Sequence, residues 1–341
     1  MSKQQLNRIL PGLVTGLFMF FIVAGLLVSS ACSTRITAAQ TKDVPPEAKA
    51  LNDAAYELIH HDNYEAALSK CREAVRLAPN FAEAQKNLAL ALNELGRYDE
   101  ALAPAQEAIR LAPNFDKAHY VLGKVLRGQG QVERAISEFK EAIRINPKYD
   151  LAYDSLAETY VRMNRVGDAV AVLQQGAKTS EEPARYYFNM GKYLQDSGDL
   201  AAAEQAYREA IKLKPDYAHP YINLGMVLAE RARLDEALKV DREAVRLAPD
   251  DVYAHNNLGN VLSRLGQHEE ALAELREAVR LAPGFAMGYF NIGGVFCRMG
   301  RIDDARAVWQ QVLTMGNPVV AGKTQEALAG CSGRAATAPS L

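Results

Sequence analysis

Residues 252–285 read VYAHNNLGNVLSRLGQHEEALAELREAVRLAPGF. Leu258 and Leu262 are four positions apart, which places both on one face of a helix. Gly266 follows, and glycine is the residue best suited to the left-handed conformation that ends a helix. The second part repeats the helical spacing and ends at Pro283, which lacks a backbone N–H. The stretch predicts two short helices and a turn, and neither helix could bury its apolar stripe without neighbours.

The same pattern recurs along the chain at a constant spacing, which is also the length of the quoted stretch. Prolines that keep this spacing, or twice it, stand at Pro79, Pro113, Pro147, Pro215, Pro249 and Pro283. A column of small residues keeps it too: Ala55, Ala89, Gly123, Ala157, Gly191, Gly225, Gly259 and Gly293. Eight units of equal length therefore run from Ala48 to Val319.

These columns resemble those of the tetratricopeptide repeat family over residues 48–319. The resemblance implies an all-α fold, a right-handed α-solenoid (superhelix) of eight helix-turn-helix units. We expect glycine or alanine on each first helix to face alanine on the second. Larger residues such as Leu258, Leu262 and Leu275 then fill the space around that contact.

Composition limits the possible functions. The chain has 39 Lys+Arg and 41 Asp+Glu, a balance that argues against a nucleic-acid-binding protein. The cysteines, Cys32, Cys71, Cys297 and Cys331, are too scattered for a disulfide framework, and no pair has metal-ligand spacing. The sequence does not decide whether Cys297 and Cys331 pair. No arrangement of nucleophile, base and orienting group is present. We therefore expect no enzyme, no cofactor, no metal site and no small-molecule substrate.

The N-terminus has the pattern of an export signal. Lys3 and Arg8 precede an apolar run that ends at Ala31, and residues 1–31 are predicted as a signal peptide or membrane anchor. Cys32 directly after the run resembles the bacterial lipoprotein signal, in which that cysteine is lipidated after cleavage. An uncleaved anchor is one alternative, because a 19-residue helix spans about 28 Å, and a plain secretory signal is another. The lipoprotein signal and the anchor would each tether the repeats to a membrane of the bacterial cell envelope, on the periplasmic or extracytoplasmic side.

The segments around and within the repeats are expected to be less regular. Residues 32–47 contain Pro45 and Pro46 and are predicted as a flexible linker. The run KTSEEP at 178–183 is predicted as a flexible joint that divides the array. Residues 320–341 are predicted as a partial cap helix, over 323–329, and a disordered tail.

One column of the repeats points to binding. In the tetratricopeptide repeat family, the position before the Leu-Gly pair tends to line the concave surface, where asparagines hydrogen-bond the backbone of an extended peptide. An amide offers both a donor and an acceptor to a peptide unit. The column supplies Asn87, Asn189, Asn223, Asn257 and Asn291, and the neighbouring candidates are Arg185, Phe188, Lys192, Tyr253, Asn256, Asn260 and Phe290. The alternative is that asparagine is frequent here in the family and serves local hydrogen bonding.

The resemblance implies a membrane-tethered scaffold that binds an extended segment or helix of a protein partner. Bacterial lipoproteins of this repeat class help to assemble pili, secretion systems or outer-membrane complexes, and we expect a function of that kind by analogy. Two other functions stay open. In the first, the chain is a regulatory or substrate-recruiting subunit of a separate envelope enzyme. In the second, it is a structural layer that associates with itself.

Overall fold

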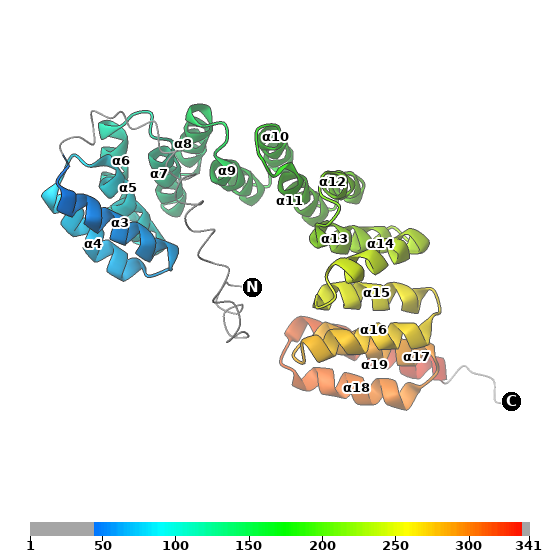
Figure 1. Cartoon of the computed structure of the whole chain (residues 1–341). Helices are drawn as coiled ribbons and strands as arrows, with labels where there is room; N and C mark the ends of the chain where they lie inside the picture. Colours follow the sequence, from blue (N-terminus) through cyan, green and yellow to red (C-terminus); the bar gives the residue numbers. More distant parts are fainter. Residues whose placement is uncertain (1–43, 336–341) are drawn as a thin grey trace, which may run out of the picture. The chain divides into compact units, whose positions relative to one another are not determined.

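The computed structural model describes residues 44–335, and the predicted signal or anchor and Cys32 lie outside this range. The described residues form seventeen α-helices and no strand (Figure 1). The first helices of the pairs are α3 (Pro46–His60), α5 (Ala82–Glu94), α7 (Asp116–Gly128), α9 (Asp150–Arg162), α11 (Pro183–Asp196), α13 (Ala218–Glu230), α15 (Val252–Arg264) and α17 (Ala286–Arg298). The second helices are α4 (Tyr64–Leu77), α6 (Tyr98–Leu111), α8 (Val132–Ile145), α10 (Val166–Ala177), α12 (Leu200–Leu213), α14 (Leu234–Leu247), α16 (His268–Leu281) and α18 (Ile302–Thr314). A last helix, α19 (Pro318–Ala335), follows them. The prediction of an all-α solenoid of eight helix pairs is confirmed.

The turn inside each pair has one backbone design. The left-handed residue is Asp62, Gly96, Gly130, Asn164, Gly198, Ala232, Gly266 or Gly300, again one repeat period apart. The next residue donates its N–H to a carbonyl five positions earlier, as Gln267 does to Leu262 at 2.9 Å. This bond satisfies a carbonyl that the helix end leaves free. The prediction for Gly266 is therefore confirmed, and the same geometry recurs in every pair.

The contact between paired helices differs from the sequence expectation. A side-chain carbon added to Gly259 would lie 2.6 Å from Leu275 Cγ and 3.1 Å from the carbonyl oxygen of Ala271. Gly123 meets Phe139 in the same way, and Gly293 meets Trp309. The small residue of the first helix therefore faces mainly a bulky side chain of the second helix, and not mainly its alanine. The absent side chain leaves space for the bulky one, so the two helices pack closely.

The chain divides into two compact units, residues 1–156 and 157–341, and the boundary lies inside α9. We call their described parts the first unit (44–156) and the second unit (157–335). The predicted joint at 178–183 is not this boundary. Helices α10 and α11 on either side of it contact each other, so KTSEEP is a turn within the second unit.

The two ends of the array also differ from the predicted boundaries. Helix α3 begins at Pro46, inside the predicted linker, because proline is well suited to the first position of a helix. Helix α19 covers 318–335, more than the predicted 323–329, and packs on α17 and α18. Val320 of α19 lies in a buried cluster with Ala286 and Val312. Burial of this apolar face of α19 explains why the helix starts earlier than predicted.

Candidate functional site

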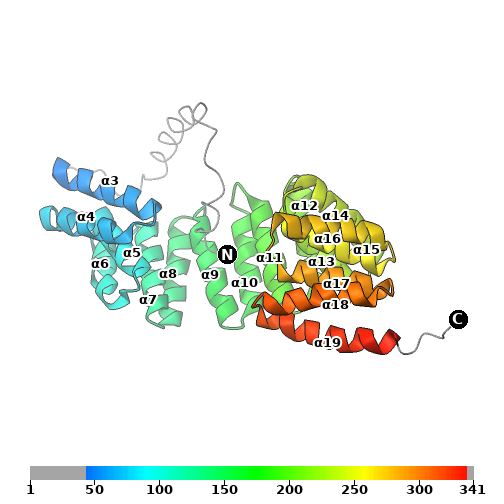
Figure 2. The same cartoon turned by 90° about the horizontal axis from the view of Figure 1, so that it is seen from below.

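The first helices of the pairs form a layer of their own. In the second unit, α11, α13, α15, α17 and α19 contact one another in sequence, whereas no two second helices approach each other to that extent. The side of a stack on which neighbours are closest is its inner side. We call these five helices, which are labelled in Figure 2, the inner layer of the second unit. In the first unit, α3, α5 and α7 contact one another in the same way.

The asparagine column connects consecutive helices of the inner layer. Asn257 donates from Nδ2 to the carbonyl oxygen of Ile222, at 3.1 Å and 35 residues away. Asn291 donates to Asn256 Oδ1 at 2.8 Å, again 35 residues away. Asn223 donates to Tyr207 Oη at 3.2 Å. The amide donors of these three asparagines are thus all used between consecutive repeats, and local hydrogen bonding accounts for this half of each amide.

The side-chain oxygens of these asparagines are placed differently from their NH₂ groups. A backbone carbonyl can only accept, so Asn257 must turn its NH₂ towards Ile222 and its Oδ1 away from it. Within residues 157–335 no hydrogen bond to Oδ1 of Asn223, Asn257 or Asn291 is found. All three side chains are half-buried. The column therefore offers acceptor oxygens, and not the full amides that the sequence suggested.

Three other predicted asparagines are placed differently. Asn189 on α11 and Asn260 on α15 are half-buried, whereas Asn256 is buried and accepts from Asn291. Asn256 therefore belongs to the contact between repeats and not to the accessible surface.

Asn87 does not lie on this surface. It belongs to α5 of the first unit and is 2% exposed. Its Nδ2 donates to Asn52 Oδ1 at 2.8 Å, and its Oδ1 accepts from Lys86 Nζ. A peptide would have to break both bonds to reach it. The predicted role of Asn87 is therefore corrected to a bond between α3 and α5.

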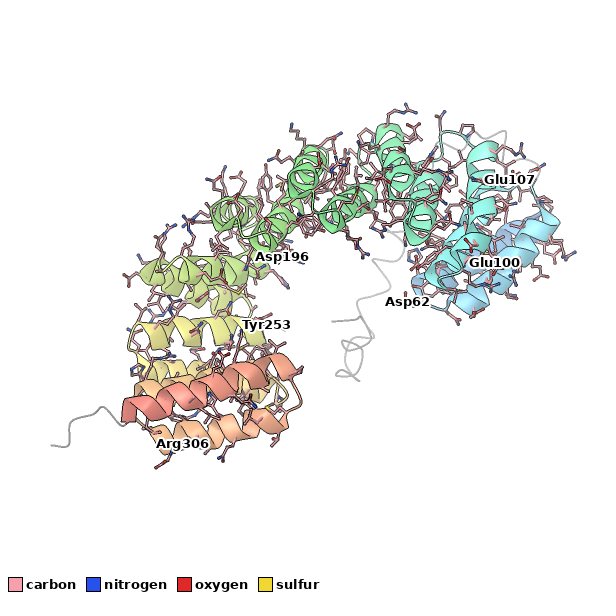
Figure 3. All side chains as sticks on the ribbon, turned by 180° about the vertical axis from the view of Figure 1, so that it is seen from behind. Asp62, Glu100, Glu107, Asp196, Tyr253 and Arg306 are labelled. Carbon is pink, nitrogen blue, oxygen red and sulfur yellow. A yellow bond between two sulfur atoms is a disulfide. The ribbon has the colours of Figure 1, made fainter. Side chains whose placement is uncertain are left out.

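The predicted aromatic and basic residues are divided between surface and core. Tyr253 is 52% exposed and meets the Phe285 ring edge-on at 5.6 Å. Lys192 is exposed and lies 5.8 Å from the centre of the Phe188 ring. Arg185 packs on the Tyr186 ring at 4.9 Å. Tyr253 of α15 and Arg306 of α18 lie on different sides of the second unit (Figure 3).

Phe188 and Phe290 serve mainly to pack helices together. The centre of the Phe188 ring lies 5.3 Å from that of the Tyr217 ring and 6.0 Å from that of the His219 ring. Phe290 packs on Trp309 at 6.3 Å and borders the core of the last repeats. Both rings are half-buried, so only part of each is available to a partner.

Two residues of the inner layer were missed by the sequence analysis. Met226 is 36% exposed, and it stands one repeat period after Lys192 and one before Asn260. His219 stands one period after Arg185 and one before Tyr253. The repeat period itself would have found both, because residues one period apart occupy equivalent places on neighbouring helices.

The first unit has a buried cation on its inner layer. Lys86 is buried, donates to Asn87 Oδ1 and lies 5.8 Å from the centre of the Tyr56 ring. Burial, and then the charge of Lys117, lower its pKa to about 8. Cys71 nearby is also buried, and burial raises the pKa of its thiol to about 12, which makes it a poor nucleophile.

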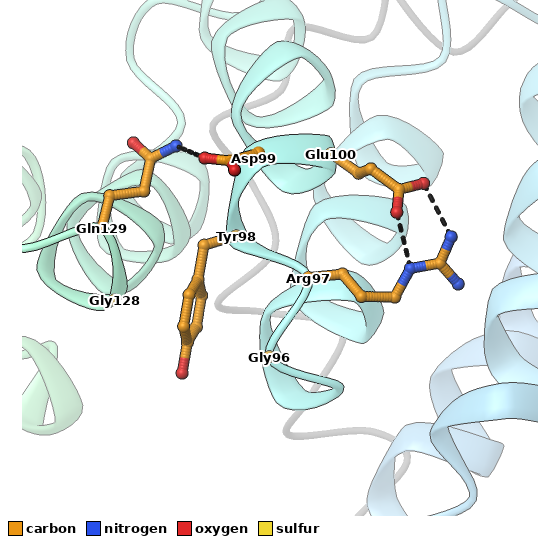
Figure 4. A pocket seen from close by; sticks show the side chains of 7 residues that line it. All are labelled: Gly96, Arg97, Tyr98, Asp99, Glu100, Gly128 and Gln129. Atoms are coloured by element: carbon orange, nitrogen blue, oxygen red, sulfur yellow. Dashed lines mark hydrogen bonds and ion pairs between the residues drawn. The ribbon is translucent and has the colours of Figure 1, made fainter.

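A shallow pocket of ≈ 390 Å³ lies at the turns of the first unit (Figure 4). The Tyr98 ring fills the space above Gly128, and Arg97 donates two hydrogen bonds to Glu100, at 2.8 and 2.7 Å. Gln129 donates to Asp99 at 2.9 Å. These groups bond to one another and do not converge on a ligand. Residues 44–335 also contain no cluster of side chains suited to a metal ion and no helix that could cross a membrane.

Models of the tetratricopeptide repeat match the chain over 52–115, 92–148, 126–187, 184–217, 216–283 and 256–318. The chain belongs to the tetratricopeptide repeat family. Proteins built from this repeat are typically non-enzymatic scaffolds, and this chain is a scaffold for protein–protein interaction. A search of curated proteins gave no match.

Solved structures of tetratricopeptide proteins are similar in fold. The Cut9–Hcn1 hetero-tetramer of the APC/C matches with 14% identity and a TM-score of 0.49, over 89% of this chain and 59% of that chain. YrrB, described as having an unusual peptide-binding site, matches with 20% identity and a TM-score of 0.43, over 54% and 95%. MamA from Desulfovibrio magneticus RS-1 matches with 23% identity and a TM-score of 0.44, over 48% and 92%. This chain thus spans less than two thirds of the Cut9–Hcn1 chain.

Proposed function

We propose that the inner layer of the second unit of this scaffold binds an extended segment of a protein partner. The observation that carries this proposal is the orientation of Asn223, Asn257 and Asn291. Their amide groups donate inside the protein, and their oxygens are left as acceptors beside the exposed Tyr253 and Met226. An extended segment presents backbone N–H groups along its length, and an acceptor in successive repeats is suited to bind them.

The side chains around the column indicate the character of the partner. Tyr253 and Met226 offer apolar contact area, which favours a segment with apolar side chains. Lys192 is exposed and carries a positive charge, which favours an acidic group near its end of the segment. The half-buried Phe188 beneath Lys192 holds that ammonium in place through its ring face.

We further propose that the scaffold is tethered to a membrane of the bacterial envelope through its N-terminus, by lipid on Cys32 or by an uncleaved anchor. The apolar run before Cys32 supports this proposal. The disulfide between Cys297 and Cys331 supports it as well, because disulfides persist in oxidising compartments and are rare in the cytosol. A function in the assembly of a pilus, a secretion system or an outer-membrane complex follows from this location.

The test is an in-cell cross-linking pull-down with matched variants. The inner-layer variant K192E/M226S/Y253S removes exposed side chains without touching the hydrogen bonds between repeats. The control K212E/L213S makes similar changes at the exposed end of α12. We expect a partner to be recovered with wild type and control and lost with the inner-layer variant, while circular dichroism shows all three folded. Equal recovery with all three would overturn the proposal.

A further inference from the structure

A hydrogen bond to a proline carbonyl joins consecutive repeats at one place. The fourth residue of a repeat supplies the donor, and the acceptor is the proline near the end of the preceding repeat. The bonds are Gln85 to Pro79 at 2.9 Å, His119 to Pro113 at 3.1 Å, Tyr153 to Pro147 at 3.3 Å, Tyr221 to Pro215 at 3.1 Å and His255 to Pro249 at 2.9 Å. An amide, a phenol and an imidazole all make this bond. The carbonyl alone therefore does not explain why two of the donors are histidines.

Each histidine has a second acceptor on its other ring nitrogen. His119 Nδ1 lies 2.7 Å from Glu138 Oε2, and His255 Nδ1 lies 2.6 Å from Glu274 Oε2. The histidines are 8% and 7% exposed. A neutral imidazole has a single N–H and can serve one of two acceptors, whereas the imidazolium serves both. The geometry of both sites is therefore that of a charged histidine.

Across the eight repeats, histidine and glutamate occur together at these two positions or not at all. Position 4 and position 23 of the eight repeats hold Leu51 with Lys70, Gln85 with Pro104, His119 with Glu138, Tyr153 with Val172, Tyr187 with Ala206, Tyr221 with Val240, His255 with Glu274, and Tyr289 with Val308. Glutamate occurs at position 23 only where histidine occurs at position 4. Tyrosine, which carries no positive charge, is always paired with Val or Ala. The two residues thus act as one unit, and each of the two units of the chain contains one such pair.

The charges around His119 favour its protonated form. Helix α8 presents Glu138 and Glu141 to it, and Glu141 is itself bonded to Arg144 at 2.7 Å. From the turn after α6 it meets the uncharged carbonyl of Pro113. Arg110, in the last turn of α6, is bonded to Glu107.

The surroundings of His255 repeat this arrangement. Helix α16 presents Glu274 and Glu277, and Glu277 is bonded to Arg280 at 2.6 Å. The turn after α14 presents the carbonyl of Pro249. Arg246, in the last turn of α14, is bonded to Glu243 in the same way as Arg110 to Glu107.

We propose that the His119–Glu138 pair is a pH-operated clamp of the first unit. When protonated, His119 ties the first helix of its repeat both to the second helix and to the preceding repeat. When it loses a proton, it must give up one of these two bonds. Acidification therefore tightens the first unit, and a rise in pH loosens it. The His255–Glu274 pair makes the same two contacts in the second unit.

The pKa of His119 agrees with this direction. Burial lowers the pKa, but the hydrogen bonds to Glu138 and to the Pro113 carbonyl together raise it above its usual value. A histidine with a raised pKa adds stability that is complete below its unfolded pKa, near 6.5, and is lost as the pH rises through the folded value.

The test replaces the clamp by the Tyr–Val pair that three other repeats already use. In H119Y/E138V the bond to the proline carbonyl is kept and the charge is removed. Thermal melts of both proteins are compared from about pH 5.5 to about pH 9. We expect the Tm of wild type to fall relative to the variant as the pH rises above about 6.5. All other ionisable groups are common to both proteins, so their effects cancel in the comparison. A Tm difference that does not change with pH would overturn the proposal.

A second measurement follows the rings directly. Side-chain ¹⁵N spectra recorded from about pH 5.5 to about pH 9 report whether each ring nitrogen carries a proton. We expect His119 of wild type to keep both ring protons to a higher pH than His119 of E138Q, because E138Q removes the charged partner of the ring. A His119 titration that is the same in wild type and E138Q would overturn the proposal.

Discussion

At the scale of single residues, Asp241 is the least expected feature of the core. It occupies the place that Tyr207, Leu275 and Trp309 fill in other repeats, facing Gly225. It is 1% exposed, and neither carboxyl oxygen has a hydrogen-bond partner among the described residues. Burial raises its pKa to about 8, so this acid is mostly protonated at neutral pH.

Replacing Asp241 by leucine should stabilise the second unit. Because the pKa of this carboxyl is raised on folding, the folded state is not penalised below the unfolded pKa, near 3.9. As the pH rises from there towards about 8, the free energy of unfolding falls. At pH 7 the cost is on the order of 4 kcal/mol, and a buried leucine adds roughly 1.5–3 kcal/mol. We expect urea unfolding of Asp241→Leu to show higher stability, with less decline between about pH 4 and 8. An unchanged pH slope would contradict this reading of Asp241.

A second residue with a local cost is Ala232, which has a φ of 59° in the turn between α13 and α14. The equivalent residue Gly266 has a φ of 83°, and no atom lies within 4 Å of the place where its side-chain carbon would be. Ala232→Gly should therefore raise the free energy of unfolding by about 0.5–1 kcal/mol, and Gly266→Ala should lower it by a similar amount. Chemical denaturation of both variants checks this pair. Shifts of the same sign would contradict the account.

At this scale the sequence predicts the turns and the close helix contacts better than the hydrogen bonds between repeats, and the reason is physical. The period placed the turn glycines and the small residues correctly, because those places follow from backbone geometry and packing. It could not show that the NH₂ of Asn257 is used on Ile222, because that bond depends on how two repeats sit together. The same limit explains why Asn87 was assigned to the surface.

At the scale of elements, α19 and its cross-link decide how the array ends. The disulfide joins Cys297 of α17 to Cys331 of α19, which are one repeat period apart. Sequence could not establish the pairing, because it requires that α19 lie beside α17 as the first helix of a ninth repeat would. The length of α19 was underestimated for the same reason, since its buried residues Val320 and Thr324 are recognised only once α18 is in place.

Removing this disulfide should loosen the end of the second unit. Closing a loop of this length stabilises a fold by about 2–4 kcal/mol. We expect Cys297→Ser/Cys331→Ser to lower the Tm, and amide hydrogen exchange to increase first in α19. The control is Cys71→Ser, at a buried free cysteine of the first unit, which should leave exchange in α19 unchanged. Equal exchange of α19 in wild type and the double variant would contradict a structural role for the cross-link.

At the scale of the whole molecule, two compact repeat units follow an N-terminal stretch with the pattern of an export signal. The sequence predicted a division of the array but placed it at 178–183, where the consensus fails, and the boundary lies in α9. A weak consensus at a turn does not weaken the array when helices on both sides still pack, as α10 and α11 do.

The proposed membrane tether makes a prediction for Cys32. If Cys32 is lipidated, Cys32→Ser should abolish incorporation of a labelled fatty acid and release the protein from the membrane fraction. Retention of the unlabelled variant on the membrane would indicate the uncleaved anchor. Fatty-acid labelling that persists in Cys32→Ser would contradict lipidation at this residue. Cys71→Ser is the matched control and should keep both properties, since Cys71 is buried.

The most direct test of the account is photo-cross-linking from single positions in living cells. A photoreactive phenylalanine analogue is placed at Tyr253 on the inner layer and, in a second protein, at Leu213 on α12, which is 43% exposed. Binding by the inner layer predicts a discrete cross-linked product from position 253 that mass spectrometry maps to one extended segment of a partner, and none from position 213. The same product from both positions, or a product from position 213 alone, would contradict binding by the inner layer of the second unit.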